Sequence, residues 1–199
     1  MENDAILDTL RRQLTPSTIQ QMSAAIGADP DATSKAVAMA LPALLGGLSR
    51  NASKPEGAME LDRALDDHDG GILDNLGGLL GGGAGAGIGA AILGHIFGAR
   101  RAPVEEGVGK ATGLDRRQVG QLLVILAPIV MAVLGRMKRQ KNLDASRLPD
   151  ALDRTTKRME PDVPGAGGLA SILDSNDDGQ IADDIARMGS SVLGGLFRK

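Results

Sequence analysis

The sequence contains no cysteine, tryptophan or tyrosine, and only two of its 199 residues are phenylalanine. The absence of cysteine excludes disulfide bonds, a thiol nucleophile and cysteine-ligated zinc or iron–sulfur sites. A core without large aromatic rings must be built from Leu, Ile, Val, Ala and Met, which suits closely packed helices. Because 42% of the residues are apolar and 24% are charged, the chain can form one domain of ordinary size or two small ones.

No stretch shows the alternation of apolar and polar residues that is typical of strands, and the connections between apolar stretches are short. This pattern predicts an all-α protein. The first residues, MENDAILDTLRRQL, are acidic and amphipathic rather than basic and then apolar. We therefore expect no secretory signal there, and we expect a cytoplasmic bacterial protein.

An internal similarity is the most informative feature of the sequence. Residues 27–50 align with residues 113–136 without a gap. Three pairs of equivalent residues are Gly27 and Gly113, Asp29 and Asp115, and Pro42 and Pro128. The glycines are expected to end a helix in the left-handed conformation, and the aspartates to cap the next helix. The prolines fall in mid-helix and should kink it.

The similarity predicts two units, 1–85 and 86–199, each with one long buried helix. We interpret residues 77–87 as a Gly-rich linker and residues 88–98 as a short helix. The long helices, expected at 30–50 and 116–138, are apolar nearly all round, so we expect them to pack on each other. The predicted fold is an all-α multihelical bundle of two pseudo-repeated units joined by the Gly-rich linker.

The first long segment also carries a family resemblance. Its motif G-x-D-x(6)-A…L-P-x-x-L-x-x-L is formed by Gly27, Asp29, Ala36, Leu41, Pro42, Leu45 and Leu48. This motif resembles the core of the YidB-like family, and the ending SSVLGGLFRK (190–199) is similar to the end of that family's members. The resemblance implies two tandem copies of a bacterial domain of unknown function with a multihelical, homeodomain-like arrangement. It implies no activity, catalytic residue or ligand.

The segment DSNDDGQIADDI (174–185) has the spacing of a calcium-binding loop. Oxygen ligands at alternate positions and a glycine at the sixth position suit a hard cation. The candidate ligands for Ca²⁺ are Asp174, Asn176, Asp178, Gln180 through its backbone carbonyl, and Asp184. Ile185 stands where a bidentate glutamate is usual, so weak binding is expected. The alternative is an acidic turn that caps the following helix.

No pattern in the sequence indicates catalysis. The segments GAGIGA (85–90) and GVGKAT (107–112) look like phosphate-binding loops, but no strand precedes the first and the second lacks the residues that hold magnesium. The acidic residues cluster in predicted turns and caps rather than on apolar surfaces. We therefore predict that the protein is not an enzyme.

Basic residues concentrate in one part of the chain. Residues 100–141 carry 9 basic and 3 acidic side chains. A DNA-binding alternative would use Arg116, Arg117, Arg136, Lys138, Arg139 and Lys141. The simpler interpretation is that cations at the end of a helix compensate its dipole. A net charge of −3 argues against a nucleic-acid partner.

Residues 75–99 contain no Asp, Glu, Lys or Arg, and Gly77, Gly81, Gly85 and Gly89 form a GxxxG series. This series suggests a membrane-associated glycine zipper as a further alternative. The many glycines weaken a helix, which argues against a membrane role. Our leading prediction is a non-enzymatic helical structural or interaction module. It would self-associate into a homo-oligomer through the apolar tail around Phe197.

Overall fold

The computed structural model describes residues 4–67, 71, 85–140 and 146–159. The first half contains α1 (Asp4–Gln13), α2 (Pro16–Ile26), α3 (Pro30–Ala52) and α4 (Pro55–Asp67). The second half contains α7 (Gly85–Phe97), the short 3-10 helix η1 (Gly98–Arg100), α8 (Arg101–Thr112), α9 (Arg116–Arg139) and α10 (Leu148–Met159). This described part contains helices and no strands, so the predicted all-α class is confirmed.

Local sequence explains where α3 begins. Gly27 ends α2 with φ 64°, in the left-handed region that glycine adopts without strain. The Asp29 side chain then accepts hydrogen bonds from the backbone N–H groups of Asp31 (2.9 Å) and Ala32 (3.1 Å). These bonds satisfy donors that have no partner inside the helix. The predicted glycine end and aspartate cap are therefore confirmed.

The second long helix begins in the same way. Gly113 ends α8 with φ 79°. The Asp115 side chain accepts from the Gln118 N–H (2.8 Å), and the Gln118 side chain accepts from the Asp115 N–H (3.0 Å). Gln118 also donates from Nε2 to the carbonyl oxygen of Gly27 (2.8 Å). The two equivalent loops, one from each half, therefore lie next to each other.

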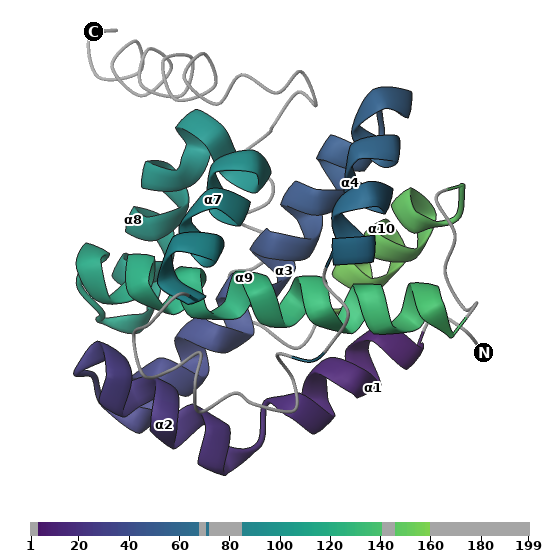
Figure 1. The fold of residues 1–199 in the computed structure, drawn as a ribbon. Helices are drawn as coiled ribbons and strands as arrows, with labels where there is room; N and C mark the ends of the chain where they lie inside the picture. The colour runs from purple at the N-terminus through teal and green to yellow at the C-terminus, as the bar shows by residue number, and fades with distance from the viewer. Residues whose placement is uncertain (1–3, 68–70, 72–84, 141–145, 160–199) are drawn as a thin grey trace, which may run out of the picture.

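The two long helices form the centre of the molecule and pack on each other, as predicted (Figure 1). Helix α3 is covered largely by helices of the other half, whereas α9 is covered by helices of both halves. Helix α3 contacts α8 and α10, while α9 contacts α1, α2 and α4. Within the second half, α7 packs extensively along α9. The described helices therefore share one core, and each half supplies much of the cover for the other.

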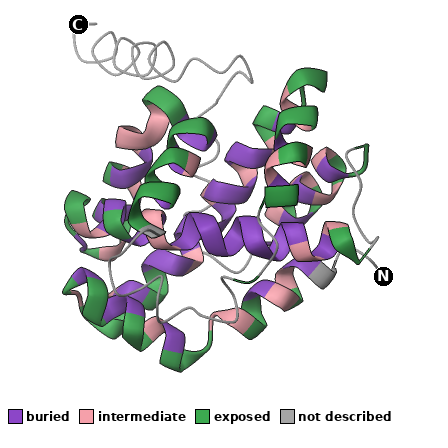
Figure 2. Cartoon of the chain, viewed as in Figure 1, coloured by how far each residue is buried: buried purple, intermediate pink, exposed green. Residues whose placement is uncertain are grey.

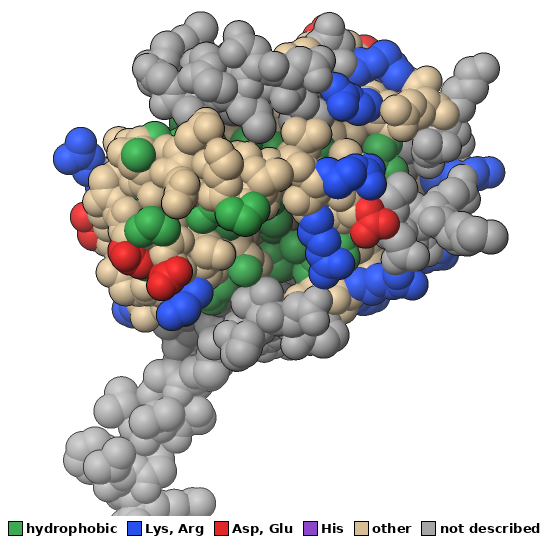
Figure 3. Space-filling view, turned by 90° about the horizontal axis from the view of Figure 1, so that it is seen from below, with side chains coloured by type: hydrophobic (Ala, Val, Ile, Leu, Met, Phe, Trp, Pro, Cys, Tyr) green, Lys and Arg blue, Asp and Glu red, His purple; other side chains and the backbone are tan. Residues whose placement is uncertain are grey.

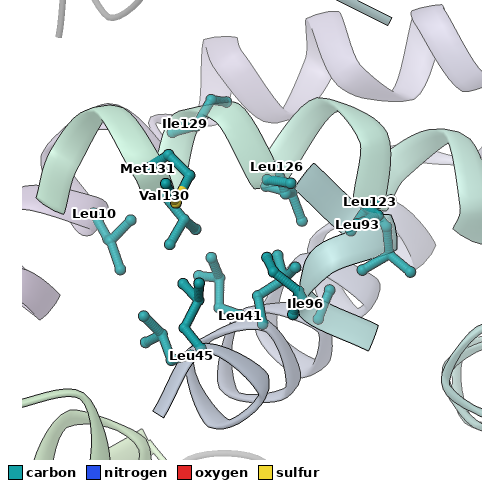
Figure 4. Close-up of a cluster of buried hydrophobic side chains, with 14 of the residues drawn as sticks. Leu10, Leu41, Leu45, Leu93, Ile96, Leu123, Leu126, Ile129, Val130 and Met131 are labelled. Carbon is teal, nitrogen blue, oxygen red and sulfur yellow. The ribbon is translucent and has the colours of Figure 1, made fainter. Parts of the chain in front are cut away.

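The core of the described part consists of aliphatic side chains from the α-helices, together with Phe97 (Figure 2). Leu126, Val130 and Met131 of α9 lie opposite Leu41 and Leu45 of α3 (Figure 4). Side chains from α1 and α7 close the same cluster. Close helix packing thus replaces the aromatic rings that the sequence lacks.

The beginning of α7 differs from the prediction. The short helix expected at 88–98 begins at Gly85 and ends at Phe97, so residues 85–87 belong to it rather than to a linker. Tertiary packing explains the difference, because helices in proteins are stabilised mainly by burying one face. Contact with α9 offsets the low helix propensity of the glycines. Residues 72–84, which include most of the predicted linker, lie outside the described residues.

Candidate interaction surface on α7

The inner face of α7 fits closely against both long helices. A Cβ atom at Gly89 would overlap the backbone carbonyl oxygen of Val124 in α9. A Cβ at Gly47 in α3 would lie 2.6 Å from Ile96 Cγ2 and 3.2 Å from Phe97 Cε1. Both distances are shorter than ordinary contacts, so glycine is required at each position for this packing. These two glycines fix the position of α7.

A side chain from α3 holds the end of α7. The Asn51 side chain donates from Nδ2 to the carbonyl oxygens of His95 (2.7 Å) and Ile96 (3.3 Å). These carbonyls belong to the last turn of the helix, where no intrahelical donor is available. Gly98 then turns the chain with φ 51° into η1. The end of α7 is therefore held by tertiary contacts.

The outer face of α7 is formed by small residues. Gly87, Ala91 and Gly94 are exposed and recur at the spacing of one helix face. A Cβ at either glycine would meet nothing within 4 Å in the described part of the protein. Ile88 borders this face and is 45% exposed. We call Gly87, Ile88, Ala91 and Gly94 the α7 outer face.

No Asp, Glu, Lys or Arg occurs in α7. This is unusual for an exposed helix surface, which normally carries charged residues. Each glycine inside a helix lowers its stability by about 0.8–1 kcal/mol relative to alanine. Within the described contacts, no packing at Gly87 or Gly94 compensates for that loss. The outer face is therefore flat, uncharged and open to a close neighbour.

A cluster of charged groups lies beyond the end of α7. The carboxylate of Glu105 is buried and binds two arginines, Arg101 Nε at 2.7 Å and Arg116 Nε at 3.1 Å. Its Oε1 also occupies the space where a Cβ at Gly120 would come within 3.0 Å. The cluster joins α8 to the beginning of α9. Glu105 therefore serves the fold, and sequence reasoning did not single it out.

A second ion-pair cluster joins α9 to α4. Lys138 Nζ lies 2.9 Å from Asp62 Oδ1 and 2.8 Å from Asp66 Oδ1, and it donates to the Asp62 carbonyl oxygen at 2.6 Å. Burial of Lys138 favours the neutral amine and so lowers its pKa, whereas the two carboxylates raise it. The hydrogen bonds and the attraction of both carboxylates outweigh burial, so the pKa of Lys138 is raised above its ordinary 10.5.

The residues of the DNA-binding alternative do not form one patch in the described structure. Arg116 and Arg117 lie in the first turn of α9, and Arg136, Lys138 and Arg139 lie near its end. At 1.5 Å per residue, the two groups are about 30 Å apart along the helix. Glu105 binds the first of these residues, and the carboxylates of α4 bind Lys138. Lys141 lies outside the described residues.

Charge is also unevenly distributed on the lower surface of the molecule (Figure 3). Lys and Arg side chains gather on the side where α1 lies, which carries Arg11 and Arg12 in its last turn. The side where α2 lies shows fewer Lys and Arg side chains and several Asp and Glu side chains, and α2 itself contains no charged residue.

The candidate calcium ligands at 174–185 all lie outside the described residues, as does the tail around Phe197. In the residues that the structure describes, no group of three or more His, Cys, Asp or Glu side chains could hold a metal ion. Within the same ranges, every buried side-chain nitrogen or oxygen has a hydrogen-bond partner.

Two of the described helices are long and apolar enough to cross a membrane by length and composition alone, Pro30–Ala52 and Arg116–Arg139. In its most apolar window, Pro30–Ala52 has 61% of its residues buried inside the protein, and Arg116–Arg139 has 78%. Such burial is also expected for the central helices of a folded core.

Comparison with known families decides what the chain is related to. A family model described as a bacterial protein of unknown function, DUF937, matches residues 8–137. The chain belongs to the DUF937 family. The DUF937 match extends from α1 to the last turn of α9, so it includes both long helices and the whole of α7. The prediction of a bacterial domain of unknown function is confirmed at this level. No curated protein and no solved structure matches the chain.

The α7 outer face was not identified from the sequence. The uncharged run at 75–99 was noted, but it was interpreted as a linker followed by a short helix. At 100° per residue, Gly89 lies on roughly the opposite side of the helix from Gly87 and Gly94. This difference between the glycines was the useful signal. Without the position of α9, nothing indicates which of the glycines faces inward.

Proposed function

We propose that this protein is a non-enzymatic helical module that self-associates, and that the α7 outer face is part of the contact. The observation that carries the proposal is that the exposed surface of this 13-residue helix carries no Asp, Glu, Lys or Arg. Small, uncharged surfaces let another chain approach closely without desolvating a charge.

The polar groups of the described part support a role without catalysis. The buried hydroxyls of Thr33 and Thr155 donate to backbone carbonyls four residues earlier, those of Asp29 and Ala151. The buried carboxylate of Glu105 is held by two arginines. These groups are engaged within the fold, and none lies free in a cleft as an acid, base or nucleophile would.

The oligomeric state tests the proposal. Sedimentation equilibrium of the full chain over a wide concentration range should give a mass above 20.5 kDa that rises with concentration. Ala91→Glu places a charge in the centre of the α7 outer face and should shift the chain towards the monomer. Ala25→Glu is the matched control, because Ala25 is an exposed alanine in α2 and lies away from α7.

Two results would contradict the proposal. One is a wild-type chain that stays at 20.5 kDa at every concentration. The other is equal weakening by both substitutions, which would place the contact elsewhere or reflect a general effect of charge. The finer resemblance to the YidB-like family and the cytoplasmic location stay predictions beside this proposal.

A further inference from the structure

The last described helix of the second half is bound to the first half. Helix α10 packs extensively along α3 and also contacts α1 (Figure 1). A Cβ atom at Gly46 of α3 would lie 3.7 Å from Thr156 Cγ2, and the Ser49 hydroxyl donates to the Pro149 carbonyl oxygen at 3.5 Å. These two contacts show that α10 runs antiparallel to α3. We call the surface of α3 and α1 that α10 covers the α10 site.

The contact between α10 and its site is mainly apolar. Leu148, Leu152 and Met159 are buried along one side of α10. The hydroxyls of Thr155 and Thr156 donate within α10, to carbonyl oxygens four residues earlier at 2.7 and 2.9 Å. Separation of α10 from α3 therefore breaks neither of these hydrogen bonds. The shape and apolar area of α10 hold it in place.

The sequence sets α10 apart from the rest of the core. The DUF937 match covers residues 8–137, so α10 lies outside it although α3 lies inside. The cover for this side of α3 thus comes from outside the matched domain. Eight residues, 140–147, join α9 to α10. Short connections of this kind favour the exchange of the element that follows them between two copies.

An α10 that leaves its place exposes two apolar surfaces at once, its own buried side and the α10 site. Exposed apolar area lowers stability by about 25 cal/mol per Å². A second copy in the same state presents both matching surfaces, with side chains of the right size and spacing. The two chains recover every contact of α10 when each binds the α10 of the other.

The α10 site also lies next to the candidate interaction surface. Gly46 and Gly47 are neighbours in α3, and the first approaches α10 while the second approaches Ile96 and Phe97 at the end of α7. A second copy that supplies α10 is therefore brought close to α7.

We propose that, when the protein associates, the α10 of each copy occupies the α10 site of the other, which closes the assembly as a two-fold dimer. This inference rests on the proposed self-association and names the element that is exchanged. The monomer and the dimer bury the same groups at the α10 site, so protein concentration decides between them. Eight extended residues span up to about 26–29 Å, which allows α10 to reach a molecule alongside.

The absence of cysteine makes disulfide trapping a clean test. One chain carries Gly46→Cys and the other carries Thr156→Cys, so each has a single thiol. The Cβ of the first would lie within contact distance of the second, as a disulfide requires. Mild oxidation of the two native variants, incubated together at high concentration, should give a reducible product of twice 20.5 kDa that joins positions 46 and 156.

The matched control replaces Thr156→Cys by Arg154→Cys. Arg154 is exposed, and two residues of helix turn its side chain by about 200° away from Gly46. The control mixture should link much more slowly. Equal rates in the two mixtures overturn the exchange, and so does the absence of a link between positions 46 and 156.

A chain that carries both Gly46→Cys and Thr156→Cys checks the packing. At low concentration it should link within one chain, which also shows that both substitutions leave α10 in place. If it fails to link, the packing of α10 against Gly46 is wrong, and the inference is overturned. If it links within one chain while the mixture does not link, each copy keeps its own α10, which overturns the exchange.

Sedimentation equilibrium separates this inference from the proposed function. If the wild-type chain associates and Ala91→Glu weakens the association, but the mixture does not link, the α7 contact stands without the exchange. If the mixture links and Ala91→Glu changes nothing, the exchange stands and the α7 outer face is not part of the contact. A wild-type chain that never associates contradicts both.

Discussion

The two halves of the molecule build similar helices but treat their surfaces differently. Helix α1 opens the first half and exposes Asp8, Arg11 and Arg12. Helix α7 opens the second half and exposes glycine, alanine, isoleucine and His95. Both helices contact the long helix of the other half. The comparison shows that the position in the fold does not require an uncharged surface, so the composition of α7 needs a separate explanation.

The halves also differ at their centres. Of the most apolar part of α9, 78% is buried, against 61% for α3. Counting back from the equivalent glycines, the position of the buried Glu105 in α8 corresponds to the partly buried Ile19 in α2. The second half is thus held by a deeper helix and an ion-pair cluster. In the first half, side chains of Thr15 and Asp29 cap the beginnings of α2 and α3.

The largest expected effect comes from equivalent leucines of the two long helices. Leu134 is 0% exposed and Leu48 is 3% exposed. We expect alanine at either position to lower the free energy of unfolding by about 2–5 kcal/mol, with the larger loss at Leu134. Because the halves share one core, urea denaturation should show a single transition in both variants. Two separate transitions, with only one of them shifted, would show that the halves fold independently.

The next effect distinguishes the two faces of α7. Gly89→Ala should lower the free energy of unfolding by about 1–3 kcal/mol, because the added methyl group overlaps the Val124 backbone. Gly94→Ala is the matched control, with open space around its new methyl group. At low protein concentration it should raise stability by about 0.8–1 kcal/mol. Thermal denaturation measures both, and equal effects would contradict the assignment of inner and outer faces.

Glu105 tests the ion-pair cluster at the position that Ile19 occupies in the first half. Glu105→Gln keeps the shape of the side chain but removes the charge that holds Arg101 and Arg116. We expect a loss of roughly 1–3 kcal/mol in the free energy of unfolding. Glu106→Gln in the next position changes only an exposed pair with Lys110 and should have little effect. If the two variants are equally stable, the buried cluster contributes nothing specific.

A pH series tests the link between α9 and α4. The pKa of Lys138 is raised in the folded protein, so its stabilising contribution is complete below the ordinary value of 10.5. The contribution is lost as the pH rises through the raised pKa. The stability difference between wild type and Lys138→Met should therefore shrink above pH 10.5. In an Asp66→Asn background the difference should be smaller throughout, and a constant difference in both backgrounds would refute this account.

The smallest effect concerns two acidic segments, the end of α4 at Asp66 and Asp67 and the segment 174–185. In the first, Asp66 is already bound to an internal cation, Lys138. In the second, at 174–185, the spacing predicts weak calcium binding. Calorimetric titration of chelator-treated protein should release or absorb heat with about one calcium per chain, and Asp178→Ala should abolish it. If the heat of calcium binding persists in Asp178→Ala but disappears in Asp66→Asn, calcium binds at the end of α4 and not at 174–185.

Sequence reasoning located the long helices well because their ends are chemically marked. Glycine and aspartate fix the beginnings of α3 and α9, and the helices predicted at 30–50 and 116–138 end within two residues of the observed ones. These signals are local, so they can be recognised without the tertiary structure.

Other features depend on contacts between distant residues and were missed. The first turn of α7 falls within the predicted linker, because its glycines disfavour a helix. The packing of α9 against Gly89, which stabilises the helix, is visible only in the structure. The partners of Lys138 are carboxylates more than seventy positions away, so no spacing in the sequence indicated them. The charge of a basic segment alone does not show which side chains are already paired.

Hydrogen exchange at two protein concentrations tests the central claim most directly, namely that the outer face of α7 is an intermolecular contact. We expect amide protection across residues 86–98 to increase with concentration, because association suppresses local opening of the helix. Protection of α2 should stay the same. Protection of α7 that is independent of concentration, or that rises equally in both helices, would contradict the account.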